Sequence, residues 1–256
     1  MWNERKNSVI LTGNMLKHNL EILFEDEYMI AVNKPAGVLT IPDRFNAALP
    51  NLATTLQRIY PEAIPVHRID KFTSGVNIFA KNAEAHKALS ALFENREIEK
   101  YYVAIVDGIP SPESGRIDIP LAESKVTRGK MLAHKRGKAS VTEYKILKSF
   151  RTYSYLYIRI LTGRMHQIRV HMQYIGNPLI VDALYGNREA FYLSEIKQKK
   201  FNLAKNEDEK PLLSRQPLHA EKLSFIHPYT ENKVEIVAPI PKDITAVVSQ
   251  MEKWIK

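Results

Sequence analysis

The densest group of chemically active side chains lies in residues 67–75, which read HRIDKFTSG. Four of them can transfer a proton or form a strong hydrogen bond: His67, Arg68, Asp70 and Thr73. Only Ile69 separates Asp70 from the guanidinium-bearing Arg68, and this spacing suggests an aspartate that is fixed in position and kept ionised. Ordinary turns show the same spacing, because an aspartate often caps a loop while a neighbouring arginine stays solvated. The spacing alone favours the turn.

Ser74 lies in the same stretch, so a nucleophilic hydrolase that uses it with His67 and Asp70 is a second interpretation. Hydrolases of the α/β type hold their serine in a strand–G-x-S-x-G–helix turn, and this stretch lacks that pattern. Three triad members so close in sequence seldom reach the required geometry. We therefore rank the hydrolase low.

The composition indicates a globular protein with an acidic partner. The chain has 256 residues, of which 45% are hydrophobic, and this suits one large domain or two small ones. A formal charge of +9 and a pI of about 9.5 favour an acidic polymer, most simply a nucleic acid. A basic surface can also serve solubility alone, and net charge does not separate the two.

The chain contains no cysteine, which excludes a disulfide framework, a thiolate nucleophile and a cysteine-ligated zinc site. This composition fits a reducing cytoplasm. Residues 1–7 lack the basic and then apolar layout of a signal peptide. No apolar run approaches the roughly 18 residues that cross a bilayer. The sequence therefore predicts a soluble, cytoplasmic protein.

Residues 67–75 resemble the HRLD-x-x-TSG signature of the RluA-type pseudouridine synthase family, with Ile69 in place of the usual leucine. Three further stretches match motifs of that family in the family's order: residues 32–37 (VNKPAG, for NKPAG), 100–108 (KYYVAIVDG, for K-x-Y-x-A-x-V-x-G) and 163–171 (GRMHQIRVH, for GRTHQIRVH). The resemblance extends from about residue 22 to 241. Four ordered matches over that length exclude chance similarity for practical purposes.

The resemblance implies an α+β protein with the pseudouridine synthase fold, a large, mostly antiparallel mixed β-sheet with flanking helices. It also implies an enzyme that isomerises specific uridines in tRNA or rRNA to pseudouridine, without a metal or an organic cofactor. By its place in the signature, Asp70 is the catalytic carboxylate. The sequence leaves open whether Asp70 attacks C1′ of the ribose or acts there as a general base.

Two further residues follow from the motifs. Tyr102 matches the active-site tyrosine that lies against the uracil, although its strand alone would make it a core residue. Arg169 is the cation that we expect to pair with Asp70, because burial disfavours a carboxylate ion and a guanidinium favours it. A non-catalytic RNA-binding or RNA-folding protein on the same scaffold is the main alternative. It would explain the charge but not the presence of all three catalytic residues.

The basic segment 122–138 is expected to be a flexible hairpin or loop that contacts phosphates and orders on binding, although a solvated surface loop has the same composition. His166 and His171 lie five residues apart, which does not suit a helical metal site, and we predict no metal there. For His67 and Thr73, bracing of the loop is the stronger expectation. The full set of expected RNA-binding residues is Lys34, His67, Arg68, Thr73, Lys125, Arg128, Lys130 and Arg164.

Hydrophobic periodicity predicts the elements that position these residues. The expected strands are 20–24, 28–32, 102–106, 141–150, 153–161, 218–225 and 234–238, and the expected helices are 82–97, 166–175 and 244–254. The tyrosine-rich face of strand 153–161 is expected to pack under a helix.

Residues 1–21 are interpreted as an extension and 22–256 as the catalytic domain, with a surface insertion at 187–212. Many members of the family carry a separate small RNA-binding domain before the catalytic one. This chain resembles the short members without it, and we expect a monomer.

Overall fold

The computed structural model describes residues 8–9, 20–202 and 208–255. Most of the expected extension 1–21, and residues 203–207 of the expected insertion, lie outside this described part. The chain divides into two compact units. Unit 1 comprises residues 1–100 and 220–239, and unit 2 comprises residues 101–219 and 240–256.

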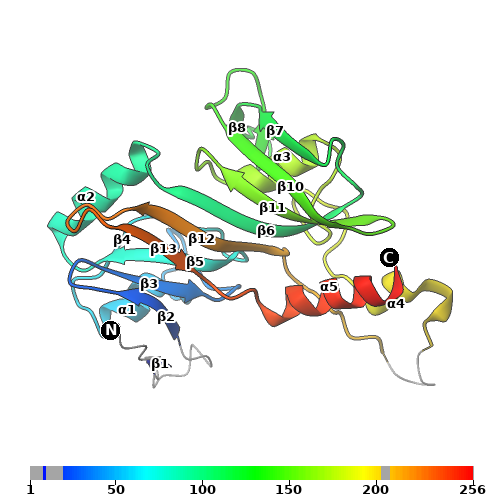
Figure 1. Cartoon of the computed structure of the whole chain (residues 1–256), viewed down its shortest axis with the longest axis horizontal. Helices are drawn as coiled ribbons and strands as arrows, with labels where there is room; N and C mark the ends of the chain where they lie inside the picture. The colour runs from blue at the N-terminus through cyan, green and yellow to red at the C-terminus, as the bar shows by residue number, and fades with distance from the viewer. Residues whose placement is uncertain (1–7, 10–19, 203–207, 256) are drawn as a thin grey trace. The chain divides into compact units, whose positions relative to one another are not determined.

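Unit 1 is built on a run of paired strands in the order β1-β2-β3-β5-β12, with β4 on β5 and β13 on β12 (Figure 1). The strands are β1 (Ser8–Val9), β2 (Leu20–Glu25), β3 (Met29–Lys34), β4 (Ile64–Pro65), β5 (Ser74–Ala80), β12 (Leu218–Ile226, in unit 1 from Ala220) and β13 (Lys233–Val237). The β2–β3, β3–β5 and β12–β13 pairs are antiparallel. The expected strands at 20–24, 28–32, 218–225 and 234–238 are therefore present.

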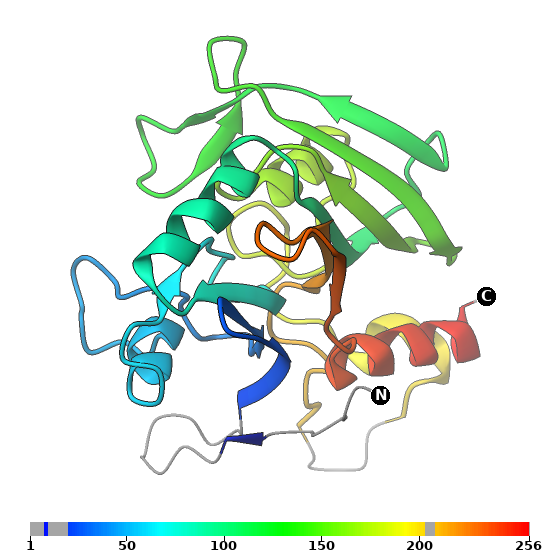
Figure 2. The ribbon, with the colours of Figure 1, turned by 60° about the vertical axis from the view of Figure 1, so that its left-hand side comes forward.

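Two helices accompany this sheet. The long one, α2 (Ala83–Glu94), begins where expected because the Asn82 side chain accepts the backbone N–H of Ala85, and it runs beside β5 (Figure 2). It ends three residues before the expected end, and Arg96 beyond it has a φ of 64°. The short one, α1 (Leu52–Gln57), was not expected, because its six residues are too few to show a helical period.

Unit 2 contains the strand order β6-β11-β10-β7 and a separate two-stranded hairpin. The strands are β6 (Glu99–Asp107, in unit 2 from Tyr101), β7 (Ser114–Asp118), β8 (Leu121–Glu123), β9 (Met131–Ala133), β10 (Val141–Ser149) and β11 (Tyr153–Ile160). The β10–β11, β10–β7 and β8–β9 pairs are antiparallel. The helices are α3 (Gln167–Tyr174), α4 (Leu193–Lys197), a 3₁₀ turn (Gln198–Lys200) and α5 (Lys242–Trp254).

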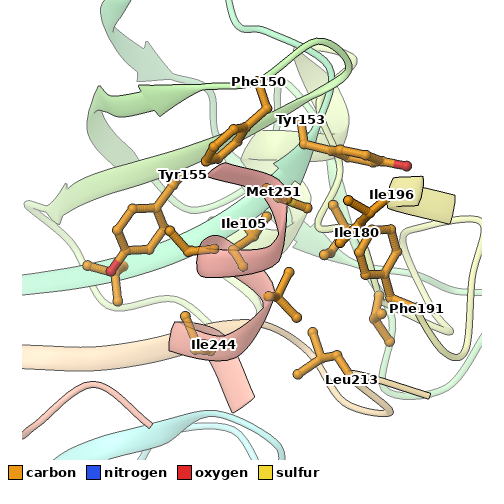
Figure 3. Packing of buried hydrophobic residues seen from close by; sticks show 14 residues of the cluster. Ile105, Phe150, Tyr153, Tyr155, Ile180, Phe191, Ile196, Leu213, Ile244 and Met251 are labelled. Atoms are coloured by element: carbon orange, nitrogen blue, oxygen red, sulfur yellow. The ribbon is translucent and has the colours of Figure 1, made fainter. Parts of the chain in front are cut away.

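The main core of unit 2 forms between β11 and α5, as Figure 3 shows. Tyr153 and Tyr155 on β11 belong to the same buried cluster as Ile244 and Met251 of the helix. The expectation that the tyrosine face packs under a helix is therefore confirmed. Phe191 belongs to the same cluster, so a buried aromatic residue anchors the expected insertion.

The expected α+β class, with mostly antiparallel pairing and flanking helices, is confirmed. Within residues 8–9, 20–202 and 208–255 no helix has the length and apolar character needed to span a bilayer, and α5 has 13 residues.

Candidate active site

Asp70 lies half-buried in the loop between β4 and β5 of unit 1. Its carbonyl oxygen accepts the backbone N–H of Thr73 at 3.1 Å, which closes the loop as a turn. The Thr40 hydroxyl lies 3.4 Å from both the N–H and the carbonyl oxygen of Ile69, directly before the aspartate. The backbone that carries the carboxylate is therefore held on its N-terminal side.

Lys34 holds the other side of this loop. Its ammonium is fully buried and donates to the carbonyl oxygens of Pro35 (3.0 Å), Val38 (2.6 Å) and Lys71 (3.0 Å). The N–H of Gly37 donates to the same Lys71 oxygen at 2.8 Å. A buried ammonium needs such acceptors. In this position Lys34 supports the loop and does not reach a phosphate, which corrects its expected role as an RNA contact.

Glycine is required where the loop enters β5. Gly75 has a φ of 116°, and a Cβ there would lie 2.1 Å from the carbonyl oxygen of Ala220 on β12. The neighbouring Thr73 is buried, and its hydroxyl has no hydrogen-bond partner among the residues that the structure describes. The end of the signature therefore belongs to the interior of unit 1.

His67 also faces inward. Its ring stacks on Phe93 of α2 with a centroid distance of 4.5 Å, and its Nε2 accepts the backbone N–H of Ile78 at 3.1 Å. The Asn77 side chain donates to the His67 carbonyl oxygen at 3.2 Å. Burial lowers the pKa of His67 to about 3, and the positive charge of Lys100 acts in the same direction. These contacts agree with the bracing role that was the stronger expectation.

The lowered pKa of His67 predicts an acid-sensitive fold. The unfolded state takes up a proton near pH 6.5, while the folded state keeps the ring neutral down to about pH 3. The stability contributed by the neutral ring is complete above about pH 6.5 and is lost as the pH falls towards 3. As the pH is lowered, the free energy of unfolding should then fall more steeply in wild type than in His67→Gln. The two slopes should differ by at most about 1.4 kcal/mol per pH unit. Urea unfolding at pH 7.5, 6 and 5 measures this, and parallel curves would contradict the inward, neutral ring.

In unit 2, Arg169 lies on α3 and is only 4% exposed. Its Nε and Nη2 donate to the two carboxylate oxygens of Asp182 at 2.6 and 2.8 Å, a bidentate ion pair. The sequence analysis gave Asp182 no role, although it lies at the end of the buried run LIVD in residues 179–182. Asp70 belongs to unit 1, so its pairing with Arg169 stays a prediction.

The remaining predicted site residues differ in exposure. Tyr102 lies on β6 and is 8% exposed, whereas Arg68 is exposed in the same loop as Asp70. Arg164 is half-buried, and its Nε donates to the Ala139 carbonyl oxygen at 3.2 Å. Arg68 therefore presents its charge to solvent, while one donor of Arg164 is already used within unit 2.

The basic segment forms the β8–β9 hairpin, in agreement with the expected hairpin or loop. The Ser124 hydroxyl accepts the N–H groups of Val126 (3.2 Å) and Thr127 (3.0 Å), and the Ser124 N–H donates to Lys130 O at 2.7 Å. These bonds form a turn between β8 and β9. Lys125 and Arg128 are exposed on it. The hairpin therefore presents cations from a defined backbone.

His171 is buried between the Thr142 hydroxyl (2.8 Å from Nδ1) and the Ile119 carbonyl oxygen (2.9 Å from Nε2). Burial lowers its pKa. These contacts make it a structural residue. The described part of the chain contains no cluster of three or more histidine, aspartate or glutamate side chains that could hold a metal ion.

Comparison with known proteins gives one consistent answer. The RNA pseudouridylate synthase family matches residues 28–174. "Ribosomal large subunit pseudouridine synthase D" of Zymomonas mobilis is 40% identical over 236 residues, which cover 88% of this chain and 70% of the relative. "Dual-specificity RNA pseudouridine synthase RluA" of Salmonella typhi is 36% identical and covers 86% of this chain and 93% of the relative.

A solved structure, "Human RNA Pseudouridylate Synthase Domain Containing 4", has the same fold, with a TM-score of 0.69 at 24% identity over 92% of this chain and 93% of that one. The matched residues 28–174 contain the Asp70 loop, β6 with Tyr102, and α3 with Arg169. The chain therefore belongs to the RluA-type branch of the RNA pseudouridylate synthase family and is an isomerase that forms pseudouridine in RNA.

Proposed function

We propose that Asp70 is the catalytic carboxylate and acts on the ribose of the target uridine. The N1–C1′ bond of the uridine breaks, the base turns, and a C5–C1′ bond forms. C5 loses its proton and N1 gains one, so the isomerisation needs no oxidant or other co-reactant. The observation that most supports Asp70 is the loop around it, because Thr40 binds the residue before it and Lys34 binds the residue after it. Such fixed geometry is what a catalytic carboxylate requires.

Arg169 is proposed to keep this carboxylate ionised in a closed site. The Asp182 pair uses the Nε and Nη2 side of the guanidinium and fixes its orientation. In this arrangement the Nη1 edge is the one that would meet Asp70. A planar guanidinium can bind two carboxylates on different edges, one of them bidentately, whereas a lysine ammonium is a point charge without such edges. This supports an arginine as the cation of the catalytic pair.

Tyr102 is proposed to lie against the uracil and to assist removal of the C5 proton. Its ring is fixed on β6 and mostly buried, which supports contact with one base rather than with a run of bases. A uridine in folded RNA must leave its stack to reach such a residue, at a cost of a few kcal/mol. Arg68, which is exposed in the same loop as Asp70, is the candidate to fill the vacated space or to bind a flanking phosphate.

The substrate is proposed to be tRNA or rRNA, modified in the cytoplasm by the monomeric protein. The relative from Zymomonas is named for the large ribosomal subunit, which supports rRNA, and the relative from Salmonella is named for dual specificity, which supports more than one kind of target. Sequence-specific recognition of RNA uses loops and unstacked bases, so the shape around the uridine would select it.

The β8–β9 hairpin is proposed to bind phosphates, and salt dependence tests this. Neutralising Lys125, Arg128 and Lys130 to glutamine should weaken RNA binding and reduce the slope of log K against log salt by roughly one for each phosphate that is no longer bound. The matched control neutralises three exposed cations elsewhere in unit 2: Lys145, Arg151 and Lys242. The affinity is measured at low and at high salt. If log K falls with log salt at the same slope in both triple variants, the hairpin is a solvated surface that binds no phosphate.

The experiment that tests the function is pseudouridine mapping of total RNA. RNA is taken from cells that lack this protein, with and without the wild-type gene restored. We expect at least one uridine in tRNA or rRNA to lose its modification and to regain it with the wild type. An unchanged map in cells that express those RNAs would overturn the assignment and favour the non-catalytic RNA binder.

A further inference from the structure

Tyr185 contacts both the β8–β9 hairpin and the helix that carries Arg169, and the proposed chemistry does not use it. It is 2% exposed and forms a small core cluster with Leu121 of β8 and Val170 of α3. Met131 of β9 packs against the same cluster. One side chain is therefore common to the proposed RNA-binding hairpin and to the catalytic helix.

The hydroxyl of Tyr185 joins two backbone segments. It accepts the backbone N–H of Met131 at 2.7 Å and lies 2.8 Å from Nδ1 of His166. Because the hydroxyl proton is not used towards Met131, it can be donated to His166 Nδ1, which is then the unprotonated nitrogen of a neutral ring. His166 precedes α3 with a φ of 56°, a left-handed conformation that surrounding contacts must hold. The hydroxyl thus fixes β9 to the start of α3.

The ring of Tyr185 has three neighbours. Lys130 Nζ, in the turn between β8 and β9, lies 5.7 Å from its centroid, and the His166 ring meets it edge-on at a centroid distance of 5.5 Å. The guanidinium carbon of Arg169 lies 4.7 Å from the Tyr185 centroid, within the range of a cation–π contact. The same guanidinium binds Asp182, whose Oδ1 also accepts the N–H groups of Leu184 (3.0 Å) and Tyr185 (3.1 Å). Arg169 is therefore held at one edge by a carboxylate and at one face by an aromatic ring. Replacing the ring with an aliphatic side chain would free that face of the guanidinium.

We propose that Tyr185 is a positioning residue that holds the hairpin and Arg169 in place together. Its hydroxyl binds the backbone of β9, and its ring contacts the guanidinium at 4.7 Å and, less closely, Lys130 at 5.7 Å. This rests on the proposed function, which assigns RNA binding to the hairpin and the catalytic pair to Arg169. The hydrogen bond to β9 uses the hydroxyl alone, whereas the contact with Arg169 uses the ring. Two substitutions should therefore separate them.

The test compares Tyr185→Phe with Tyr185→Met in single-turnover assays and RNA-binding assays. Tyr185→Phe loses the hydroxyl and keeps the ring, so the RNA dissociation constant should rise about fivefold, as expected when one hydrogen bond is removed, and the rate constant should fall less. Tyr185→Met fills similar space without a π face, so the rate constant should fall at least about thirtyfold. The acid limb of its pH–rate profile should also move to higher pH, because a displaced cation favours the carboxylate ion less. A merely structural role would not move that limb.

Tyr144→Phe is the matched control, because Tyr144 is also buried in unit 2 and its hydroxyl donates to the Pro112 carbonyl oxygen at 3.1 Å. It should match wild type in rate and affinity. Amide hydrogen exchange adds a measurement that needs no activity: the Met131 N–H should exchange faster in Tyr185→Phe and not in Tyr144→Phe.

Unchanged exchange at Met131, or equal rate losses in Tyr185→Phe and Tyr185→Met, would overturn the proposal. If Tyr185→Met does not fold, the rate, affinity and exchange of Tyr185→Phe against Tyr144→Phe decide it. A wild-type protein that modifies no RNA would refute the proposed function instead, and the exchange result would still decide whether the hydroxyl holds the hairpin.

Discussion

Asp70→Asn should abolish pseudouridine formation and leave RNA affinity close to wild type. The amide has the shape of the carboxylate, and the loop is held through backbone atoms and the side chains of Thr40 and Lys34. The geometry should therefore persist. An amide is neither a nucleophile nor a base, so the single-turnover rate constant should fall by roughly 10⁴-fold or more.

Tritium release from uridine labelled at C5 measures the reaction of Asp70→Asn, because C5 must lose its hydrogen before pseudouridine is complete. Filter binding measures the RNA affinity of the same preparation. Asp118→Asn is the control, since Asp118 is an exposed aspartate on the β7 strand of unit 2. Wild-type release by Asp70→Asn would remove Asp70 from the chemistry, and lost affinity with intact chemistry would make it a binding residue.

The parts of the fold that could be predicted from the sequence are those that depend on local patterns. The helix at 82–97 was predicted from its apolar spacing and from Asn82, and the Asn82 side chain indeed caps α2. The strand pair 141–150 and 153–161 was predicted from alternation, and β10 pairs with β11. In both cases the signal and the structure arise from the same few neighbouring residues.

The support of the candidate site could not be predicted in this way, because it depends on contacts between residues far apart in sequence. Lys34 was expected to bind a phosphate because it is a cation in a loop, yet it binds a carbonyl oxygen 37 residues away, at Lys71. Asp182 and Tyr185 lie in the chain that follows α3. The sequence gave neither residue a role, although both contact Arg169. Sequence motifs identify candidates for the residues that perform the chemistry, whereas the residues that orient those candidates emerge only from packing.

Arg169→Met should also abolish activity, and here RNA affinity should change little because the guanidinium is buried rather than directed to a phosphate. The catalytic carboxylate would lose the cation that favours its ionised form, so the single-turnover rate constant should fall at least about a thousandfold. Normal turnover would refute the Asp70–Arg169 pair.

A loss of stability must be separated from that loss of catalysis, because Arg169→Met leaves Asp182 buried without its cation, at a cost of roughly 3–5 kcal/mol. Arg215 supplies the matched control in the same unit. Its Nε and Nη2 bind Asp243 at 2.6 and 2.8 Å, the distances of the Arg169–Asp182 pair. Arg215→Met should lower the free energy of unfolding, less strongly because Asp243 is partly exposed, and retain turnover.

The double variant Arg169→Met/Asp182→Asn removes the orphaned charge and should recover stability without recovering activity. If activity returned with stability, Arg169 would be a residue of the fold and not of the reaction. If stability returned alone, the guanidinium would have a catalytic role that its ion pair with Asp182 does not explain. Thermal unfolding and single-turnover rates, measured on wild type, Arg169→Met and the double variant, distinguish these outcomes.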